Sequence, residues 1–529
     1  MIESPFIHDW LFAHAAVQPD APAVTAPGCL VSYGELAERV RALAGQLSSA
    51  GVRRGDRVLA ALPNCPATVV TSLAIGAAGA TSVEVSRDLG ADALREIAAR
   101  CGARHLFVAG RDARGCAPRT AGSPLERLWV VHRNPLRDLG EPGADDLPAT
   151  WVLEDGRVDP SLAPAEFRPA TDLAPDAPAV ILYTSGSTGR PRGVIQTFRN
   201  LSANSRSIVR YLGLTAADRA LLILPLSYCY GRSVLQTHLL VGGSIHLDGR
   251  FAFPRVVMEA LGSEGCTGFA GVPLTYEILR RKVDVSTLSL PRLRYLTQAG
   301  GAMAAETIDW VREAFRPARL FVMYGQTEAT ARLSYLPPER CDEKRGSIGI
   351  AIPGVELRVV DEQGAELPPG EVGHLVARGD NVTPGYLDDA EATRAILHDG
   401  WLWTGDLAER DADGFFFHRG RSSEVLKIGG HRVGPVEIEQ VVSEHPDVDE
   451  AAVVAAAHAL MGEVAVAFVV PRPGRQPTAA SLATFCRARM PAHRVPARFT
   501  LVESLPRNAA GKLLRAELTA RARADAPIT

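Results

Sequence analysis

The sequence AVILYTSGSTGRPRGV, residues 179–194, runs from an apolar segment directly into a loop of hydroxyls, glycines and cations. The apolar start reads as a buried strand. Glycines let backbone N–H groups approach an anion closely, hydroxyls add donors, and Arg192 adds a fixed positive charge. The loop is therefore a candidate polyphosphate site. It is not the P-loop of the common NTPases, because Pro191 stands where that pattern needs glycine and no Gly-Lys-Ser/Thr follows.

Helix-like and strand-like segments alternate through the first half of the chain, which predicts an α/β fold with doubly wound layers. Ligands of such sheets lie at the carboxyl ends of strands. Prolines, glycines and charges interrupt residues 110–178, so we expect a long irregular connection there, with a hairpin near Trp151. The expected helices cover residues 33–44 and 92–100, and the expected strands cover residues 58–63, 106–108, 179–182, 221–225 and 320–324.

Length and composition limit the possible classes of protein. A chain of 529 residues is too long for one ordinary core and predicts at least two domains. The net charge of −3 gives no electrostatic reason to expect nucleic acid. We expect no secretion signal and no membrane span. The eight cysteines form no Cys-x-x-Cys pair, which favours reduced thiols in a cytoplasmic enzyme.

The loop closely resembles the phosphate-binding signature of the adenylate-forming superfamily, which includes acyl-CoA synthetases, nonribosomal peptide adenylation domains and beetle luciferases. The resemblance continues in the order of the family's motifs over most of the chain. These motifs are YGQTE at 324–328, GSIG at 346–349, PG at 353–354, WTGD at 403–406, GR at 420–421, KIGGHRV at 427–433 and PRNAAGK at 506–512.

The resemblance implies a large N-terminal domain, residues 1–421, of doubly wound α/β subdomains with a small β-rich subdomain. It also implies a small mobile α+β lid, residues 422–529, that turns at a hinge near Ser423. Short strands are expected at 355–360, 373–376 and 415–417, and in the lid helices at 436–439 and 482–490 and a strand at 464–470.

The reaction implied by the resemblance is the attack of a carboxylate on the α-phosphorus of ATP, which gives an acyl-adenylate and pyrophosphate. Glu328 resembles the family's magnesium contact, with Thr184 beside it. Asp406 is expected to hold the ribose, and Arg192 stands where relatives usually have lysine. The nucleotide-binding residues implied are Thr184, Ser185, Gly186, Ser187, Thr188, Gly189, Gly301, Ala302, Met303, Tyr324, Gly325, Gln326, Thr327, Asp406 and Arg421.

Two postures of the lid are implied by the same resemblance. In the first posture Lys512 swings in to bind the carboxylate and the α-phosphate. After pyrophosphate leaves, the lid rotates and a second face lines the channel for the thiol of coenzyme A. The residues of that face are Lys427, Gly429, Gly430 and His431.

The acyl pocket departs most from the family pattern. Tyr228 replaces a histidine that thioester-forming relatives often carry, and a tyrosine does not titrate near neutral pH. Gly231 stands where amino-acid-activating relatives place an aspartate, so an α-amino acid is disfavoured. Fatty and aromatic acids both fit a largely apolar pocket. The expected substrate contacts are Tyr228, Tyr230, Gly231, Val234 and Gly300.

The sequence leaves three candidate functions. The leading interpretation is an acid–thiol ligase that transfers the acyl group to coenzyme A. The alternative within the fold is a stand-alone ligase that feeds a carrier protein, an amine or another small nucleophile. A non-enzymatic adenylate-binding protein with a degenerate site is disfavoured, because Thr188, Glu328, Asp406 and Lys512 are all retained.

Overall fold

The computed structural model divides into two compact units. The first unit comprises Met1–Cys341, Ala351–Glu356 and Arg378–Leu402, and the second comprises Asp342–Ile350, Leu357–Ala377 and Trp403–Thr529. The predicted division at residues 421 and 422 stays a prediction. The residues described are 2–116, 123–132, 149–158, 167, 170, 173–184, 191–424, 426–428, 431–458, 462–507 and 513–524.

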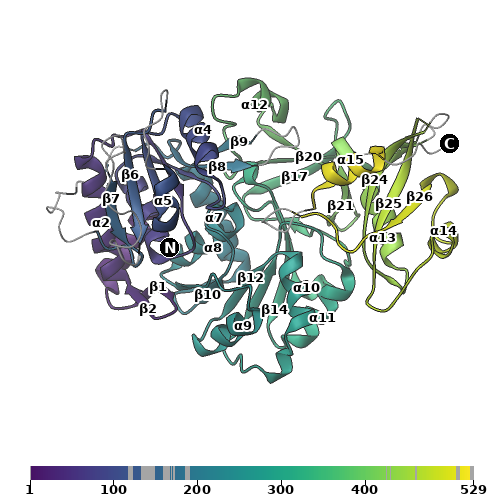
Figure 1. The fold of residues 1–529 in the computed structure, drawn as a ribbon, viewed down its shortest axis with the longest axis horizontal. Helices are drawn as coiled ribbons and strands as arrows, with labels where there is room; N and C mark the ends of the chain where they lie inside the picture. The colour runs from purple at the N-terminus through teal and green to yellow at the C-terminus, as the bar shows by residue number, and fades with distance from the viewer. Residues whose placement is uncertain are drawn as a thin grey trace. The chain divides into compact units, whose positions relative to one another are not determined.

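A seven-stranded sheet of the first unit carries the predicted phosphate loop near one edge, between β8 and β9 (Figure 1). Its strand order is β7-β6-β5-β3-β4-β8-β9, and all neighbours are parallel except β8 and β9. The loop therefore leaves the carboxyl end of a strand, as expected. The strands are β3 (Arg57–Ala61), β4 (Thr81–Glu84), β5 (His105–Ala109), β6 (Arg127–His132), β7 (Ala149–Leu153), β8 (Pro178–Thr184) and β9 (Arg192–Thr197).

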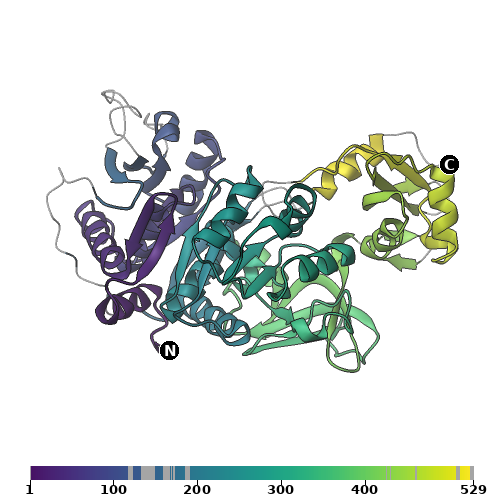
Figure 2. The same cartoon turned by 90° about the horizontal axis from the view of Figure 1, so that it is seen from below.

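Helices cover both faces of this sheet (Figures 1 and 2). Along β8, Val180 and Leu182 pack in the core shared with α1 to α3, whereas Ile181 packs in the core shared with α4 and α5. This period of two buries the strand on both sides and confirms the doubly wound prediction. The helices are α1 (Ile7–Val17), α2 (Tyr33–Ser49), α3 (Pro66–Ala77), α4 (Ala91–Cys101) and α5 (Gly110–Cys116).

The prediction of an irregular connection over residues 110–178 is wrong in part. Strands β6 and β7 lie within it and pair in parallel at the sheet edge. A short strand in a parallel sheet is a brief apolar run without alternation, and prolines and charges around it hide the signal. The hairpin expected near Trp151 is reduced to one bridge, between Val152 and Val158.

A nine-stranded sheet forms the rest of the first unit's core, in the order β16-β15-β14-β13-β12-β10-β11-β1-β2. Figure 1 shows α7 and α8 on one face and α9 to α11 on the other. The strands are β1 (Pro22–Ala26), β2 (Cys29–Ser32), β10 (Arg219–Leu222), β11 (Ser244–Leu247), β12 (Gly268–Gly271), β13 (Tyr295–Gln298), β14 (Arg319–Tyr324), β15 (Ser334–Leu336) and β16 (Ile350–Ala351). The helices are α7 (Phe198–Leu212), α8 (Cys229–Val241), α9 (Pro254–Ser263), α10 (Pro273–Lys282) and α11 (Ala305–Ala314).

The strand expected over residues 221–225 ends at Leu222. Beyond this strand, the Asn64 side chain binds the backbone of the following loop. Its Nδ2 donates to Leu224 O at 2.7 Å, and its Oδ1 accepts from Leu226 N at 3.1 Å. Proline at position 225 has no N–H to continue a ladder. Asn64 therefore fixes the loop that leads into α8 and Tyr228.

Two further sheets lie mostly in the second unit. In the later one, α13 and α14 pack on one face and α15 on the other. The strands of the earlier sheet are β17 (Val355–Val360), β18 (Val372–Gly379), β19 (Leu397–His398), β20 (Trp401–Arg410) and β21 (Phe416–Arg421). The later sheet has β22 (Leu426–Ile428), β23 (His431–Val433), β24 (Val448–His458), β25 (Gly462–Pro471) and β26 (Arg498–Leu501). The helices are α12 (Ala390–Ile396) of the first unit, and α13 (Pro435–Ser443), α14 (Ala479–Arg487) and α15 (Arg515–Ala524).

These elements confirm the positions of the short strands and helices expected in the last third of the chain. Among the helices of the described residues, none combines the length and apolar character that a membrane span requires.

A buried ion pair joins helix α8 to the seven-stranded sheet of the first unit. Arg232 of α8 and Glu84, the last residue of β4, are each 5% exposed, and their side chains form an ion pair. Arg232 Nη2 also donates to Ser72 Oγ at 2.8 Å. Burial lowers the pKa of Arg232, and Glu84 supplies the opposing charge that a buried cation requires. The pair holds the first turn of α8 against the seven-stranded sheet.

We expect Arg232→Met to lower the free energy of unfolding by about 3–5 kcal/mol, because it leaves the Glu84 carboxylate buried without a partner. The double variant Arg232→Met/Glu84→Leu should recover most of this loss, since it removes both charges. Equilibrium denaturation of the three proteins measures the difference. A double variant that is no more stable than the single variant would show that the two charges are not coupled.

Candidate active site

The predicted phosphate loop is bracketed by an antiparallel pair of strands. Thr184 ends β8 and lies opposite Arg192, the first residue of β9. Ser185, Gly186, Ser187, Thr188 and Gly189 lie outside the described residues. The structure therefore locates both ends of the loop, and the roles expected of its central residues stay predictions.

Arg192 lies beside residues from a segment almost 200 positions later in the chain. Its Nε is 3.5 Å from Asp389 Oδ2, and its guanidinium carbon is 5.5 Å from the centre of the Tyr386 ring. Tyr386 in turn donates a hydrogen bond to Glu328 Oε1 at 2.8 Å. Burial, and then the nearby Glu328 carboxylate, raise the pKa of Tyr386, so its hydroxyl stays a proton donor. A cation, a phenol and a carboxylate thus lie together beside the start of β9.

The YGQTE motif begins at the end of β14, with Tyr324 as its last strand residue. Thr327 Oγ1 donates to Cys229 Sγ at 3.6 Å, which links the motif to the first residue of α8. The Nε2 of Gln326 is buried and has no hydrogen-bond partner among the residues that the structure describes. A buried amide donor without a partner is costly, so Gln326 is well suited to receive a ligand.

The chain reverses directly after the motif at Thr330. Its φ is +67° and ψ is −58°, and Ala331 N donates to Ala329 O at 2.7 Å. These values define the rarer and more strained of the two γ-turn forms, the one with positive φ at its central residue. The strain marks a conformation that the surrounding structure imposes.

Three buried amide side chains hold this turn. Asn381 Nδ2 donates to Ala329 O at 3.2 Å and to Arg332 O at 2.9 Å, and Asn381 O accepts from Thr330 Oγ1 at 2.6 Å. Asn204 donates to Arg332 O at 3.1 Å. Gln196 donates to Thr330 O at 3.1 Å and to Thr327 O at 3.0 Å. Gln196 of β9, Asn204 of α7 and Asn381 therefore impose the turn together.

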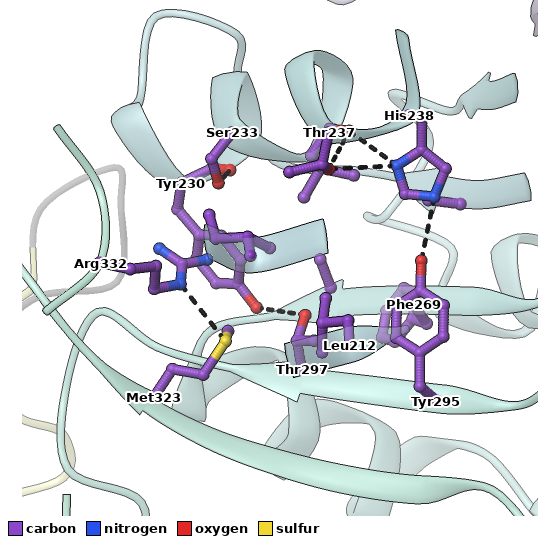
Figure 3. Close-up of a pocket in the computed structure, with 14 residues that line it drawn as sticks. Leu212, Tyr230, Ser233, Thr237, His238, Phe269, Tyr295, Thr297, Met323 and Arg332 are labelled. Carbon is purple, nitrogen blue, oxygen red and sulfur yellow. Dashed lines mark hydrogen bonds between the residues drawn. The ribbon is translucent and has the colours of Figure 1, made fainter. Parts of the chain in front are cut away.

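A narrow hollow lies between α7, α8 and the nine-stranded sheet (Figure 3). Its volume is about 20 Å³, on a scale on which one water needs roughly 10–15 Å³. In this conformation it therefore admits a group of one or two heavy atoms. Its walls are Ile208, Leu212, Ala220, Tyr230, Ser233, Val234, Thr237, His238, Phe269, Ala270, Tyr295, Thr297, Met323 and Arg332.

Two of the five expected substrate contacts, Tyr230 and Val234, line this hollow. Tyr228, Gly231 and Gly300 lie outside its wall. Gly231 is packed against backbone, since a Cβ there would be 2.3 Å from Pro225 O. The place expected for an aspartate in amino-acid-activating relatives therefore has no room for a side chain.

Tyr228 and Gly300 face each other. Gly300 has φ +90°, and a Cβ there would lie 2.6 Å from the Tyr228 hydroxyl. Burial raises the pKa of Tyr228, in agreement with the expectation that it does not titrate near neutral pH. Gly301 and Ala302 follow on the surface, with Met303 half-buried, and Gly301 O accepts from Gln298 at 2.7 Å.

In the second unit Asp406 and Arg421 lie opposite each other on β20 and β21. Asp406 is buried, with its Oδ1 2.9 Å from Arg421 Nε and 3.5 Å from His418 Nε2. Sequence reasoning missed His418. A carboxylate held between a guanidinium and an imidazole is fixed in direction, which suits recognition of a pair of hydroxyls.

The lysines expected to act from the lid are located only in part. Lys427 is the central residue of β22, opposite Arg432 of β23, and His431 begins β23. Gly429, Gly430 and Lys512 lie outside the described residues. The roles of all five residues named for the two postures stay predictions.

Sequence reasoning also missed Tyr386, Asp389 and Arg332. Tyr386 is 58 residues from its partner Glu328, and no local pattern connects them. Arg332 stands only four residues after Glu328, but an arginine next to a loop is ordinarily exposed.

We expect Thr330→Gly to be more stable than Thr330→Ala by about 1–2 kcal/mol. Both substitutions remove the hydroxyl that bonds Asn381, but only glycine adopts this backbone conformation without strain. Denaturant unfolding of the two variants gives the comparison. An alanine variant as stable as the glycine variant would contradict the strained turn.

Three comparisons place the chain among known proteins. The family model described as AMP-binding enzyme matches residues 11–387, and the model described as AMP-binding enzyme C-terminal domain matches residues 437–512. A feruloyl-CoA synthase from Amycolatopsis sp is 33% identical over 514 residues, which cover 97% of this chain and 98% of that protein.

The fold is similar to that of solved enzymes over nearly the whole chain. An o-succinylbenzoate CoA synthetase from Bacillus subtilis, in complex with an acyl-adenylate intermediate, superposes with a TM-score of 0.81 at 28% identity and covers 98% of both chains. The same enzyme was also solved with ATP and magnesium ion. An amide bond synthetase from Marinactinospora thermotolerans superposes with a TM-score of 0.84 at 26% identity, over 97% of this chain and 99% of that one. On these matches and the motif geometry, the chain belongs to the AMP-binding enzyme family.

Proposed function

We propose that the chain is an ATP- and Mg²⁺-dependent ligase that converts a carboxylic acid to an acyl-adenylate and transfers the acyl group to coenzyme A. The observation that carries this proposal is the contact of Glu328 with Tyr386 beside Arg192, at the strand end where the phosphate loop begins. The full-length similarity to a feruloyl-CoA synthase supports a coenzyme A ligase.

In the first step an oxygen of the substrate carboxylate attacks the α-phosphorus of ATP. The bond from that phosphorus to the oxygen bridging to the β-phosphate breaks, and pyrophosphate leaves with the electron pair. Negative charge crowds at the reacting centre, so the protein's task is positioning and neutralisation. Arg192, the N–H groups of the loop and Lys512 supply that neutralisation.

Glu328 fits the role of a metal ligand. Tyr386 donates to Oε1 and thereby fixes the carboxylate, and no side chain of the described residues donates to Oε2. Carboxylate oxygens are ligands that Mg²⁺ prefers, so Glu328 would hold the ion. Bound there, the ion would supply positive charge against the phosphate oxygens. Thr184 is proposed as the second contact and Gln326 as a ligand donor.

In the second step the thiol sulfur attacks the acyl carbon, AMP leaves with its oxygen, and the thiol proton passes to solvent. We propose that residues 422–529 form a lid that turns near Ser423 between the two steps. Lys512 serves the first posture, and the face with Lys427 and His431 serves the second. Asp406 and Arg421 hold the ribose between them.

The acid is proposed to be fatty or aromatic, because the expected substrate contacts Tyr230 and Val234 lie among mainly apolar and aromatic side chains, although the hollow between them is too small for such an acid until a side chain moves. The absence of space for a carboxylate at Gly231 supports the exclusion of α-amino acids. We also propose that the protein acts in the cytoplasm, where its eight free cysteines remain reduced.

Two observations favour a different acceptor. Tyr228 stands in place of the histidine expected in thioester-forming relatives, and the fold is as similar to an amide bond synthetase as to coenzyme A ligases. The alternative is therefore transfer to an amine, another small nucleophile or a separate carrier protein.

A screen of pyrophosphate release over fatty, aryl and amino acids tests the first step, and mass spectrometry of products with coenzyme A, amine or carrier protein present tests the second. We expect release with fatty or aryl acids and a coenzyme A thioester as product. No release with any acid, although ATP binds, would overturn the proposed function.

We expect Lys512→Ala to slow adenylation by about 10²-fold or more, since it removes a cation from the reacting phosphate, yet to spare thioester formation from supplied acyl-AMP. Lys427→Ala should do the reverse. Each half-reaction is followed separately by pyrophosphate release and by thioester yield. The control is Lys282→Ala, an exposed residue at the end of α10, which should change neither. Equal losses of both half-reactions in both variants would contradict the two-posture lid.

A further inference from the structure

Arg332 is a buried cation whose partners among the described residues are all uncharged. Its side chain is only 3% exposed. Nε donates to Met323 Sδ at 3.3 Å, Nη1 donates to Ala331 O at 3.0 Å, and the guanidinium carbon lies 4.1 Å from the centre of the Tyr230 ring. Figure 3 shows this guanidinium directed toward Tyr230 at the wall of the hollow.

No carboxylate in the described part of the chain lies within 4.0 Å of this guanidinium. This sets it apart from the other buried aspartate, glutamate, lysine and arginine side chains of the described residues, each of which has an opposite charge at that distance. Those pairs are Arg232 with Glu84, Asp218 with Arg294, Asp248 with Arg250, Lys344 with Asp411, and Asp406 with Arg421.

An unpaired buried charge is expensive, and arginine cannot escape the cost by losing its proton. A thioether and a carbonyl are weak substitutes for a carboxylate. The aromatic face of Tyr230 offsets part of the cost. The rest of this free-energy cost would be offset by a ligand with a negative charge. The planar guanidinium offers such a ligand two parallel N–H donors.

The other polar groups on the wall are already satisfied. Tyr230 and Thr297 share a hydrogen bond of 2.7 Å. His238 Nδ1 lies 2.8 Å from Val234 O, so it is the protonated nitrogen, and Nε2 accepts from the Tyr295 hydroxyl at 3.0 Å. Burial lowers the pKa of His238, which keeps the ring neutral. The positive charge of the hollow therefore resides on Arg332.

The turn at Thr330 separates this charge from the phosphate site. Glu328 precedes the turn and contacts Tyr386 near Arg192, whereas Arg332 follows it and enters the hollow. The carboxyl group that reacts with ATP belongs on the side of Glu328. An anion that met Arg332 would therefore be a different group from the reacting carboxyl.

We infer that Arg332 binds a second anionic group, a carboxylate or sulfonate, at the end of the substrate acid remote from its reacting carboxyl. This inference rests on the proposed function and narrows its substrate class to acids with two negative charges. A carboxylate or sulfonate is larger than the one or two heavy atoms that the hollow admits in this conformation, so its binding beside Arg332 requires a side chain of the wall to shift.

Matched pairs of acids that differ only in the second charge test this inference. Pyrophosphate release is measured for cinnamate against 4-carboxycinnamate and for hexanoate against adipate. In the pair that the protein uses better, we expect kcat/KM to be at least tenfold higher for the dianion. Arg332→Met should lose that preference by lowering the rate with the dianion alone, and Arg332→Lys should retain part of it.

A wild-type preference for the monoanion in both pairs, or an equal loss with both members in Arg332→Met, would overturn the inference and leave the proposed function standing. No release with any acid would overturn the proposed function instead, and the inference is then decided by thermal unfolding of the apo protein.

We expect Arg332→Met to unfold at the same temperature as the wild type or higher, and Arg232→Met, which breaks a paired buried arginine, to unfold several degrees lower. Adipate or 4-carboxycinnamate should raise the midpoint of the wild type and not that of Arg332→Met. A midpoint that falls as far in Arg332→Met as in Arg232→Met would make Arg332 a structural residue.

Discussion

The reversal of the chain at Thr330 is the constraint on which the arrangement of the active site depends. A β-branched residue at φ +67° is strained, and it persists because Gln196, Asn204 and Asn381 bind the backbone on both sides of it. Before the turn Glu328 contacts Tyr386 near Arg192, and after it Arg332 enters the wall of the hollow. One strained residue thereby lies between the residues proposed to bind the nucleotide and the arginine inferred to bind the acid.

Charge pairing distinguishes the parts of the molecule that serve stability from those that serve ligands. Arg232 and Glu84 neutralise each other where α8 meets the seven-stranded sheet of the first unit. Arg332 and the buried amide of Gln326 have no such compensation in the described chain. Natural proteins tolerate uncompensated groups at functional sites and compensate for them elsewhere. The two kinds of buried polar group therefore point to different roles.

Much of the fold was predictable because its signals are local. The apolar run into the glycine-rich loop predicts β8, and helical spacing predicts α2 and α4. Strand β6 was missed because a short buried strand lacks alternation. The contact of Tyr386 with Glu328 and the burial of Arg332 depend on long-range packing, which no spacing in the sequence expresses. Lys427 and Lys512 were named from motif order alone, and the roles expected of them stay predictions.

Acid-dependent exchange of labelled pyrophosphate into ATP, with Mg²⁺ present, in the wild type and in Glu328→Gln tests directly whether Glu328 holds the metal for adenylation. We expect exchange in the wild type with at least one carboxylic acid and a loss of about 10²-fold or more in the variant, because a neutral amide binds a hard cation poorly. Exchange that is unchanged by the substitution, or ATP binding without exchange for every acid, would contradict this expectation.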